Sequence, residues 1–178
     1  MNAHEQAAGA SRKLLAALAV LAVAFVVLAA VPAVAGTEGE AETSAVTYSV
    51  GGEGASDDNG DGDATPFATI AKAISYAQEK SVSVLVIEVK DDVTGNGVVV
   101  KGMDLTINYN GHKFTIDGET VGSTGTETQG FQLLQGSTVK MNGGTVFSEK
   151  AKILIQNYSD LTLTGMTLDG SKLADSVA

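Results

Sequence analysis

The feature that most constrains the fold of this chain is an internal repeat in its second half. In three segments, an aliphatic residue is followed six positions later by a second and eight positions later by a third. A glycine then follows, with another apolar residue three positions after it. The aligned sets are Val99, Leu105, Ile107, Gly111 and Phe114; Leu133, Val139, Met141, Gly143 and Val146; and Ile155, Leu161, Leu163, Gly165 and Leu168. Hairpins have no reason to keep these intervals, whereas stacked repeats that share a core do.

The spacing of the repeat predicts a parallel β-solenoid. The last two units are 22 residues apart, and the first two are 34 apart because a polar insertion, Asp117 to Gly130, separates them. A period near 22 with two short strands and no helix is typical of one solenoid coil. The alternative is an antiparallel sandwich with similar hairpins. The predicted inward columns are Val99, Leu133 and Ile155, and Leu105, Val139 and Leu161.

A strand, a loop and a helix are predicted ahead of the repeat. Val46 to Val50 is a short strand candidate, and the glycine and aspartate tract from Gly51 to Thr65 must be a loop. From Pro66 the apolar residues recur at intervals of three and four, which predicts a helix over 66–79 with Thr65 as its N-cap. From Ser81 onward the composition predicts strands and turns.

These segments together resemble the right-handed parallel β-helix proteins of the pectate-lyase-like superfamily, specifically its bacterial secreted and surface members. The resemblance covers about Val46 to Gly170. Its sharpest part is the run Pro66, Phe67, Ala68, Thr69, Ile70, Ala73 and Ile74, which resembles the helix that caps the amino end of such a β-helix. It implies an all-β domain of few coils at 46–170, with the capping helix at 66–79 and a tail at 171–178. The chain departs from the enzymes of this superfamily in holding far fewer coils, and it has no evident carboxyl-terminal cap.

The amino terminus is expected to direct export. Arg12 and Lys13 precede an apolar run of 18 residues, Leu14 to Val31, and Pro32 and the triplet Ala33–Val34–Ala35 follow. This is the order of a secretory signal peptide at 1–35, with 36–45 as a flexible lead-in. An uncleaved membrane anchor is the alternative, since 18 apolar residues reach the lower limit for a spanning helix. We expect a secreted or cell-surface protein that meets the membrane only through this segment, if it is not cleaved.

The composition restricts the classes of molecule that the chain is expected to bind. Residues 36–178 carry 9 lysines, no arginine and 20 acidic residues, a formal charge of −11. Nucleic acid and anionic lipid are therefore not expected as partners. The chain has no cysteine, so burial, backbone ladders or bound ions must stabilise it.

One loop has the composition of a calcium site. Asp57, Asn59, Asp61 and Asp63 are alternate oxygen-bearing residues around glycines, as in the opening of a calcium loop. The twelfth position from Asp57 is Ala68, where an EF-hand needs a bidentate glutamate, so an EF-hand is excluded. A looser structural calcium site is the only cofactor hypothesis, and a solvated acidic loop is its alternative.

The residues that a lyase of this fold would need are not evident. A polysaccharide lyase needs a neutraliser for the uronate carboxylate and a base to remove a proton. In the pectate lyases that the chain resembles, the base is usually an arginine, and residues 36–178 contain none. Lys101, Lys113 and Lys140 lack a nearby acidic cluster in the sequence and are expected to be solvated surface residues.

A hydrolase of this fold would need paired carboxylates on neighbouring coils. Asp104 and Asp160 occupy equivalent positions of the repeat, but Thr138 occupies that position in the coil between them. They are therefore interpreted as turn residues. His112 has no partner in the sequence and is expected in an exposed turn.

No catalytic residue is assigned on these grounds. The first hypothesis is an exported noncatalytic β-helix module, a surface or secreted scaffold that contacts glycans or surface proteins. The alternative is the amino-terminal fragment of a polysaccharide lyase or glycoside hydrolase of the β-helix fold.

Overall fold

The computed structural model describes residues 44–58, 60–61 and 64–174, which all belong to one compact unit, Glu40–Ala178. The predicted signal peptide at 1–35 and most of the lead-in at 36–45 lie outside the described residues, as do Asn59 and Asp63 of the predicted calcium loop. Within the described ranges, no helix is long and apolar enough to cross a membrane.

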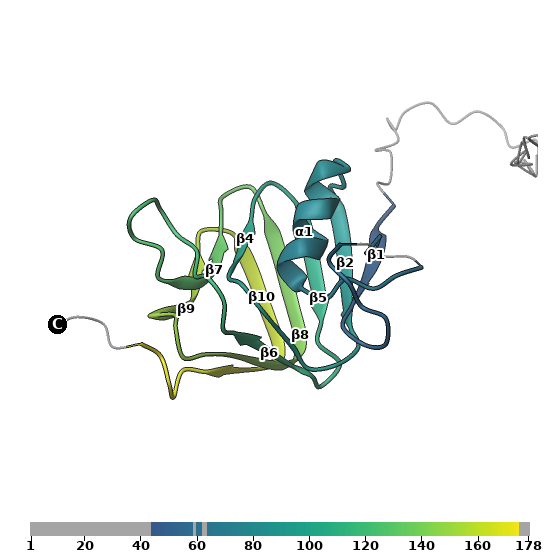
Figure 1. The fold of residues 1–178 in the computed structure, drawn as a ribbon. Helices are drawn as coiled ribbons and strands as arrows, with labels where there is room; N and C mark the ends of the chain where they lie inside the picture. The colour runs from purple at the N-terminus through teal and green to yellow at the C-terminus, as the bar shows by residue number, and fades with distance from the viewer. Residues whose placement is uncertain (1–43, 59, 62–63, 175–178) are drawn as a thin grey trace, which may run out of the picture. The chain divides into compact units, whose positions relative to one another are not determined.

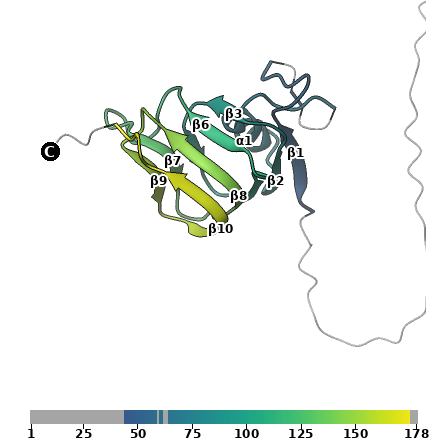
Figure 2. The same ribbon diagram turned by 90° about the horizontal axis from the view of Figure 1, so that it is seen from below.

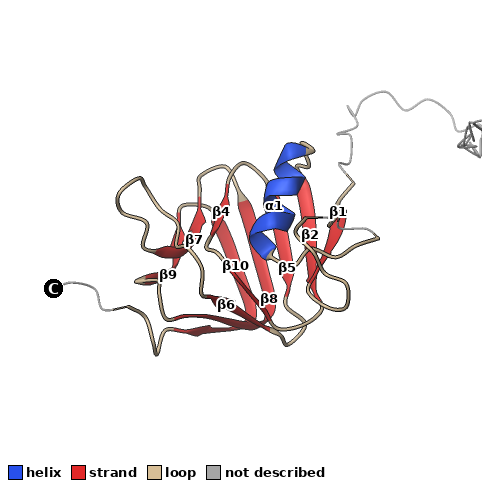
Figure 3. Ribbon diagram, viewed as in Figure 1, coloured by secondary structure: helices blue, strands red, loops and turns tan. Residues whose placement is uncertain are grey.

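The described chain is mostly β structure with one helix of ten residues (Figure 3). In chain order the elements are β1 (Val46–Val50), α1 (Ile70–Glu79), β2 (Val84–Val89), β3 (Val93–Gly95), β4 (Val98–Val100), β5 (Asp104–Asn108), β6 (Lys113–Ile116), β7 (Gln129–Leu133), β8 (Thr138–Ser148), β9 (Ile153–Asn157) and β10 (Asp160–Asp169).

The strands form two sheets in which every strand pair is parallel. The larger sheet has the order β1-β2-β5-β8-β6-β3, and β10 pairs with β8; the smaller has the order β4-β7-β9. The larger sheet curls because β8 pairs with β5 through its first half and with β6 through its second half (Figures 1 and 2). Gly143 and Gly165 lie at this bend with φ of 60° and 62°, a conformation that favours glycine. The parallel pairing rules out the antiparallel sandwich for the described residues.

The strand register confirms one predicted inward column. Leu105 pairs with Val139, and Val139 pairs with Leu161. Equivalent residues of the three repeat units therefore lie side by side on neighbouring strands. The same column continues to Leu85 and Val46. Two further columns follow from the repeat, namely Ile107, Met141 and Leu163, and Phe114, Val146 and Leu168. The intervals found in the sequence therefore correspond to the register of the sheet.

The second predicted column is wrong. Val99 is 38% exposed and pairs with Gln132, whereas the buried Val100 pairs with Leu133. The inward residues of β4 are its first and last valines, and Ile155 aligns with Phe131. Because Val98, Val99 and Val100 are identical, the alternation of a strand leaves no trace in this stretch of sequence.

The predicted start of the helix is also wrong. Thr69, not Thr65, is the N-cap, and its side chain accepts a hydrogen bond from the backbone N–H of Lys72. Pro66 and Phe67 precede the helix, and Phe67 bridges to Val50 of β1 as extended chain. The helix covers the core near β1, β2 and β4 with its buried residues Ile70, Ala73, Ile74 and Ala77 (Figure 1).

The opposite side of the core, at β9 and β10, is left largely uncovered by the described chain. Ile153 is 43%, Leu163 41% and Leu168 42% exposed, although the last two lie in inward columns. Past β10 the described chain turns back, and the backbone N–H of Ala174 donates to the carbonyl of Ala151 at 3.0 Å. Leu173, on this returning segment, is partly buried against the core.

Candidate functional site

The outer face of the larger sheet carries only polar side chains along β5 and along the first halves of β8 and β10. Since the inward residues of β5 and β8 are apolar and buried, the residues between them point outward. The nine outward positions of β5, β8 and the first half of β10 form what we call the polar plate: Asp104, Thr106 and Asn108; Thr138, Lys140 and Asn142; and Asp160, Thr162 and Thr164. None of the nine is buried.

The register arranges the polar plate as three rows. Asp104, Thr138 and Asp160 form the first row, which confirms that the two aspartates occupy equivalent positions with a threonine between them. Neighbouring strands lie about 4.8 Å apart, and side chains two positions apart on one strand are separated by about 6.6 Å. The result is a regular array of hydroxyl, amide, carboxylate and ammonium groups on a rigid sheet.

The third row of the polar plate is held by side-chain hydrogen bonds. The amide of Asn142 donates to Oδ1 of Asn108 at 3.0 Å, and the amide of Asn108 donates to Oε1 of Glu88 at 2.6 Å. Asn110 donates to the other oxygen of Glu88 at 2.9 Å. Burial raises the pKa of Glu88, but the hydrogen bonds from Asn110 and Asn108 and the charge of Lys90 together hold that pKa below its ordinary value. The two asparagines of this row are therefore held in place, and the neighbouring Glu88 of β2 is charged at neutral pH.

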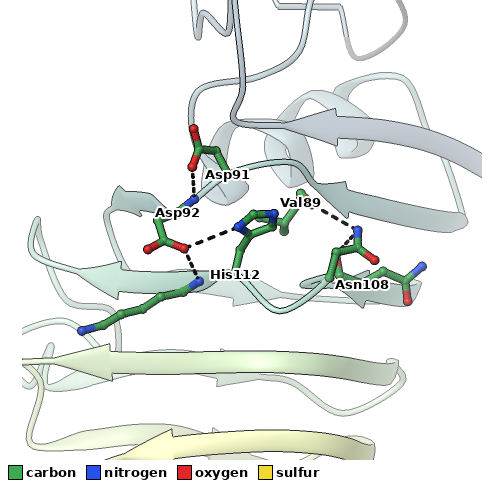
Figure 4. Close-up of polar contacts among 7 residues, drawn as sticks. Val89, Asp91, Asp92, Asn108 and His112 are labelled. Carbon is green, nitrogen blue, oxygen red and sulfur yellow. Dashed lines mark hydrogen bonds and ion pairs between the residues drawn. The ribbon is translucent and has the colours of Figure 1, made fainter.

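The turn beyond this row brings His112 next to Asp92 (Figure 4). His112 Nδ1 lies 3.5 Å from Asp92 Oδ1, and the same oxygen accepts a hydrogen bond from the backbone N–H of Lys113 at 2.9 Å. The expectation that His112 has no partner is therefore wrong, because stacking brings together residues that are far apart in the sequence. In the part of the chain that the structure describes, no third ligand accompanies them to form a metal-binding group. The pair fixes the turn.

The three lysines singled out in the sequence have different environments. Lys113 Nζ lies 4.0 Å from the ring centroid of Phe147, a cation–π contact. Lys101 and Lys140 are exposed as expected. Lys140 is the central residue of the polar plate, and it lines a small hollow with Asp104 and Thr138.

A larger hollow opens at the edge of the polar plate, where β7 leads into β8 and β9 leads into β10. Its volume is about 450 Å³. We call it the Tyr158 hollow, because Tyr158 is 61% exposed there. Its lining includes Gln135, Ser137, Thr138, Tyr158, Ser159 and Asp160, so it shares Thr138 and Asp160 with the polar plate. Sequence reasoning missed it; the available signal was a tyrosine in a polar turn between two apolar units.

The acidic loop at 57–63 has a structural role at two of its carboxylates. Asp57 Oδ1 accepts the backbone N–H groups of Ala68 at 2.9 Å and Thr69 at 3.0 Å, and its Oδ2 accepts the hydroxyl of Thr69 at 2.7 Å. Asp61 Oδ1 accepts the N–H of Thr65 at 3.0 Å. These bonds tie the loop to the chain that enters α1. Calcium binding by Asp57, Asn59, Asp61 and Asp63 stays a prediction, since two of these residues are not described.

We expect Asp57→Ala to lower the free energy of unfolding by about 2 kcal/mol without calcium, because three hydrogen bonds to a carboxylate are lost. Urea denaturation measures this loss, and Asp58→Ala, which removes an exposed neighbouring carboxylate, is the control. Equal effects of the two substitutions would contradict the structural role. Added calcium that raises the melting temperature of the unchanged protein, but not of the variant carrying Asp57→Ala and Asp61→Ala, would support the predicted site. No rise at millimolar calcium would contradict it.

The chain matches no protein-family model, no curated protein and no solved structure.

Proposed function

We propose that this chain is an exported, noncatalytic module of the right-handed parallel β-helix class that binds glycans through the polar plate. The support for the class is the register: equivalent residues of β2, β5, β8 and β10 pair in parallel, and the chain passes through the smaller sheet between β2 and β5, β5 and β8, and β8 and β10. The support for export is the apolar run and small-residue triplet at the amino terminus.

The observation that carries the glycan proposal is the uniform polarity of nine outward positions on three strands. A glycan presents many hydroxyl groups along an extended chain, and each hydroxyl both donates and accepts hydrogen bonds. The polar plate offers donors and acceptors at fixed spacing on a sheet, so little side-chain order has to be created on binding. The formal net charge of −10 disfavours nucleic acid and anionic lipid as alternative ligands.

Binding to a panel of soluble polysaccharides tests the proposal. We expect retardation of the protein in gels that contain a bound glycan, and a loss of affinity of about tenfold when Lys140→Met and Thr162→Val are combined, because two polar contacts are removed. Lys101→Met is the matched control, since it removes an equally solvated lysine outside the polar plate. Equal weakening by the control, or no binding to any glycan of the panel, would contradict the proposal.

An enzymatic function is the second candidate, and one observation favours it. Asp104 and Asp160 lie on strands either side of Thr138, two strand spacings or about 9.6 Å apart, which is just beyond the upper limit of about 9.5 Å for the carboxyl groups of inverting glycosidases. They lie on an open face, however, and both side chains are exposed to solvent. We expect no cleavage of the same panel of polysaccharides, including polygalacturonate with calcium. New reducing ends or unsaturated products would show cleavage and would favour the enzymatic function.

A further inference from the structure

The Tyr158 hollow combines an exposed aromatic ring with polar groups at the edge of the polar plate. The other aromatic residues of the described chain are buried or half-buried, whereas Tyr158 is 61% exposed. The backbone beneath the ring is fixed, because the N–H of Tyr158 donates to the carbonyl of Leu133 at 2.8 Å. The hollow thus presents a flat apolar surface in a defined position.

The polar groups of the hollow divide into occupied and free ones. The hydroxyl of Ser137 accepts the N–H of Gly102, and the hydroxyl of Ser159 donates to Asn157 Oδ1. The side chains of Gln135, Thr138 and Asp160 make no hydrogen bond to any other described residue. An amide, a hydroxyl and a carboxylate therefore remain free beside the ring.

This combination matches the chemistry of a sugar ring. One face of a pyranose carries C–H groups, which pack on an aromatic face, while hydroxyl groups project from its edge. A ligand held by one apolar platform and a few convergent polar groups is oriented as well as bound. A sugar packed on Tyr158 would reach the free groups with its hydroxyls.

The charge of the hollow favours a neutral sugar. Asp160 contributes a carboxylate, and none of the residues that line the hollow is a lysine or arginine. A uronate carboxylate placed there would meet a like charge with no neutralising partner, and the chain as a whole is acidic. A neutral sugar can instead donate a hydroxyl hydrogen bond to Asp160.

We propose that the Tyr158 hollow is a subsite for one uncharged sugar residue of a glycan that continues across the polar plate through Thr138 and Asp160. This inference rests on the proposed glycan-binding function. It adds the class of the ligand and the residue that discriminates it.

Titration calorimetry with neutral oligosaccharides of the binding polysaccharide and with oligogalacturonate tests the subsite. Tyr158→Ala should weaken neutral binding about tenfold, and Tyr158→Phe should keep it within about twofold, because the ring and not the hydroxyl carries the contact. Asp160→Asn should improve binding of the oligogalacturonate relative to the neutral ligand. Leu168→Ala is the control, since it truncates a similarly exposed apolar side chain on the uncovered side of the core outside the hollow.

The outcomes separate the two proposals. If Lys140→Met with Thr162→Val weakens binding while Tyr158→Ala leaves it unchanged, the subsite is wrong and the polar plate stands. Preferred binding of the acidic ligand by the unchanged protein also overturns the neutral subsite. If the unchanged protein binds no glycan, both proposals fail. A change in the chemical shifts of the Tyr158 ring on addition of the neutral ligand, with no change in those of Leu168, would support the subsite directly.

Discussion

Replacing Leu105 by alanine is expected to lower the free energy of unfolding by about 3 kcal/mol. Leu105 is 1% exposed and lies between Leu85 and Val139 in the central inward column. Truncation removes apolar contacts and leaves a cavity, which backbone ladders on both sides prevent from closing. Urea denaturation should show a lower midpoint with an unchanged slope.

The matched control is Leu163→Ala, the same change at the uncovered side of the core. Leu163 is 41% exposed, and it has a neighbour in its column, Met141, on one side instead of two. Its truncation should cost less than about 1.5 kcal/mol, because it removes less buried area and creates no closed cavity. A loss as large as that of Leu105→Ala would mean that the side of the core at β10 is covered in solution, which contradicts the structure.

Gly144→Ala is expected to cost about 3 kcal/mol, although it adds a single methyl group. A Cβ at this position would lie 2.5 Å from the carbonyl oxygen of His112 and nearer still to the Cβ of Tyr109. Tyr109 is fully buried, and the carbonyl of His112 accepts the N–H of Thr145, so neither neighbour can move without disturbing the turn. Loss of stability should therefore appear together with changed chemical shifts at His112.

Gly136→Ala separates steric crowding from backbone strain. Gly136 has a φ of 82°, but a Cβ there would meet nothing within 4 Å. Its replacement should cost only the left-handed strain of a non-glycine residue, about 1 kcal/mol. If Gly136→Ala were the more damaging of the two, close packing at Gly144 would not be the controlling factor.

Gly143 and Gly144 show where sequence reasoning succeeded and where it did not. The repeat located the glycine at the bend, Gly143, because its interval to the next inward residue recurs. The neighbouring Gly144 has no counterpart in the other units, and its role depends on a tyrosine 35 positions earlier in the sequence. A periodic pattern detects what each coil shares, but not what one coil needs for its own packing.

The predictions of the helix start and of an inward Val99 were wrong for other reasons. A plausible N-cap and proline at 65–66 satisfied the local rules for a helix start, yet Asp57 holds the chain extended through Thr69 by bonds that span 11 and 12 residues. Three consecutive valines at 98–100 hid the alternation that would have shown which of them points inward. In both cases local sequence allowed two answers, and tertiary contacts selected one.

The intervals between apolar residues predicted the register of the inward column through Leu105 and Val139, because equal intervals favour equal register when every repeat unit must bury the same face. The acidic charge and the absence of disulfides also follow from the sequence alone. The parallel direction of the strands, which the intervals left open, was decided by the tertiary structure. The tertiary structure decided which polar residues become neighbours. His112 is 20 residues from Asp92, and Tyr158 and Gln135, from neighbouring units of the repeat, line the same hollow. Turn residues carry no packing constraint that every unit shares, so their pattern leaves no periodic signal, and only the folding of the intervening chain brings them together.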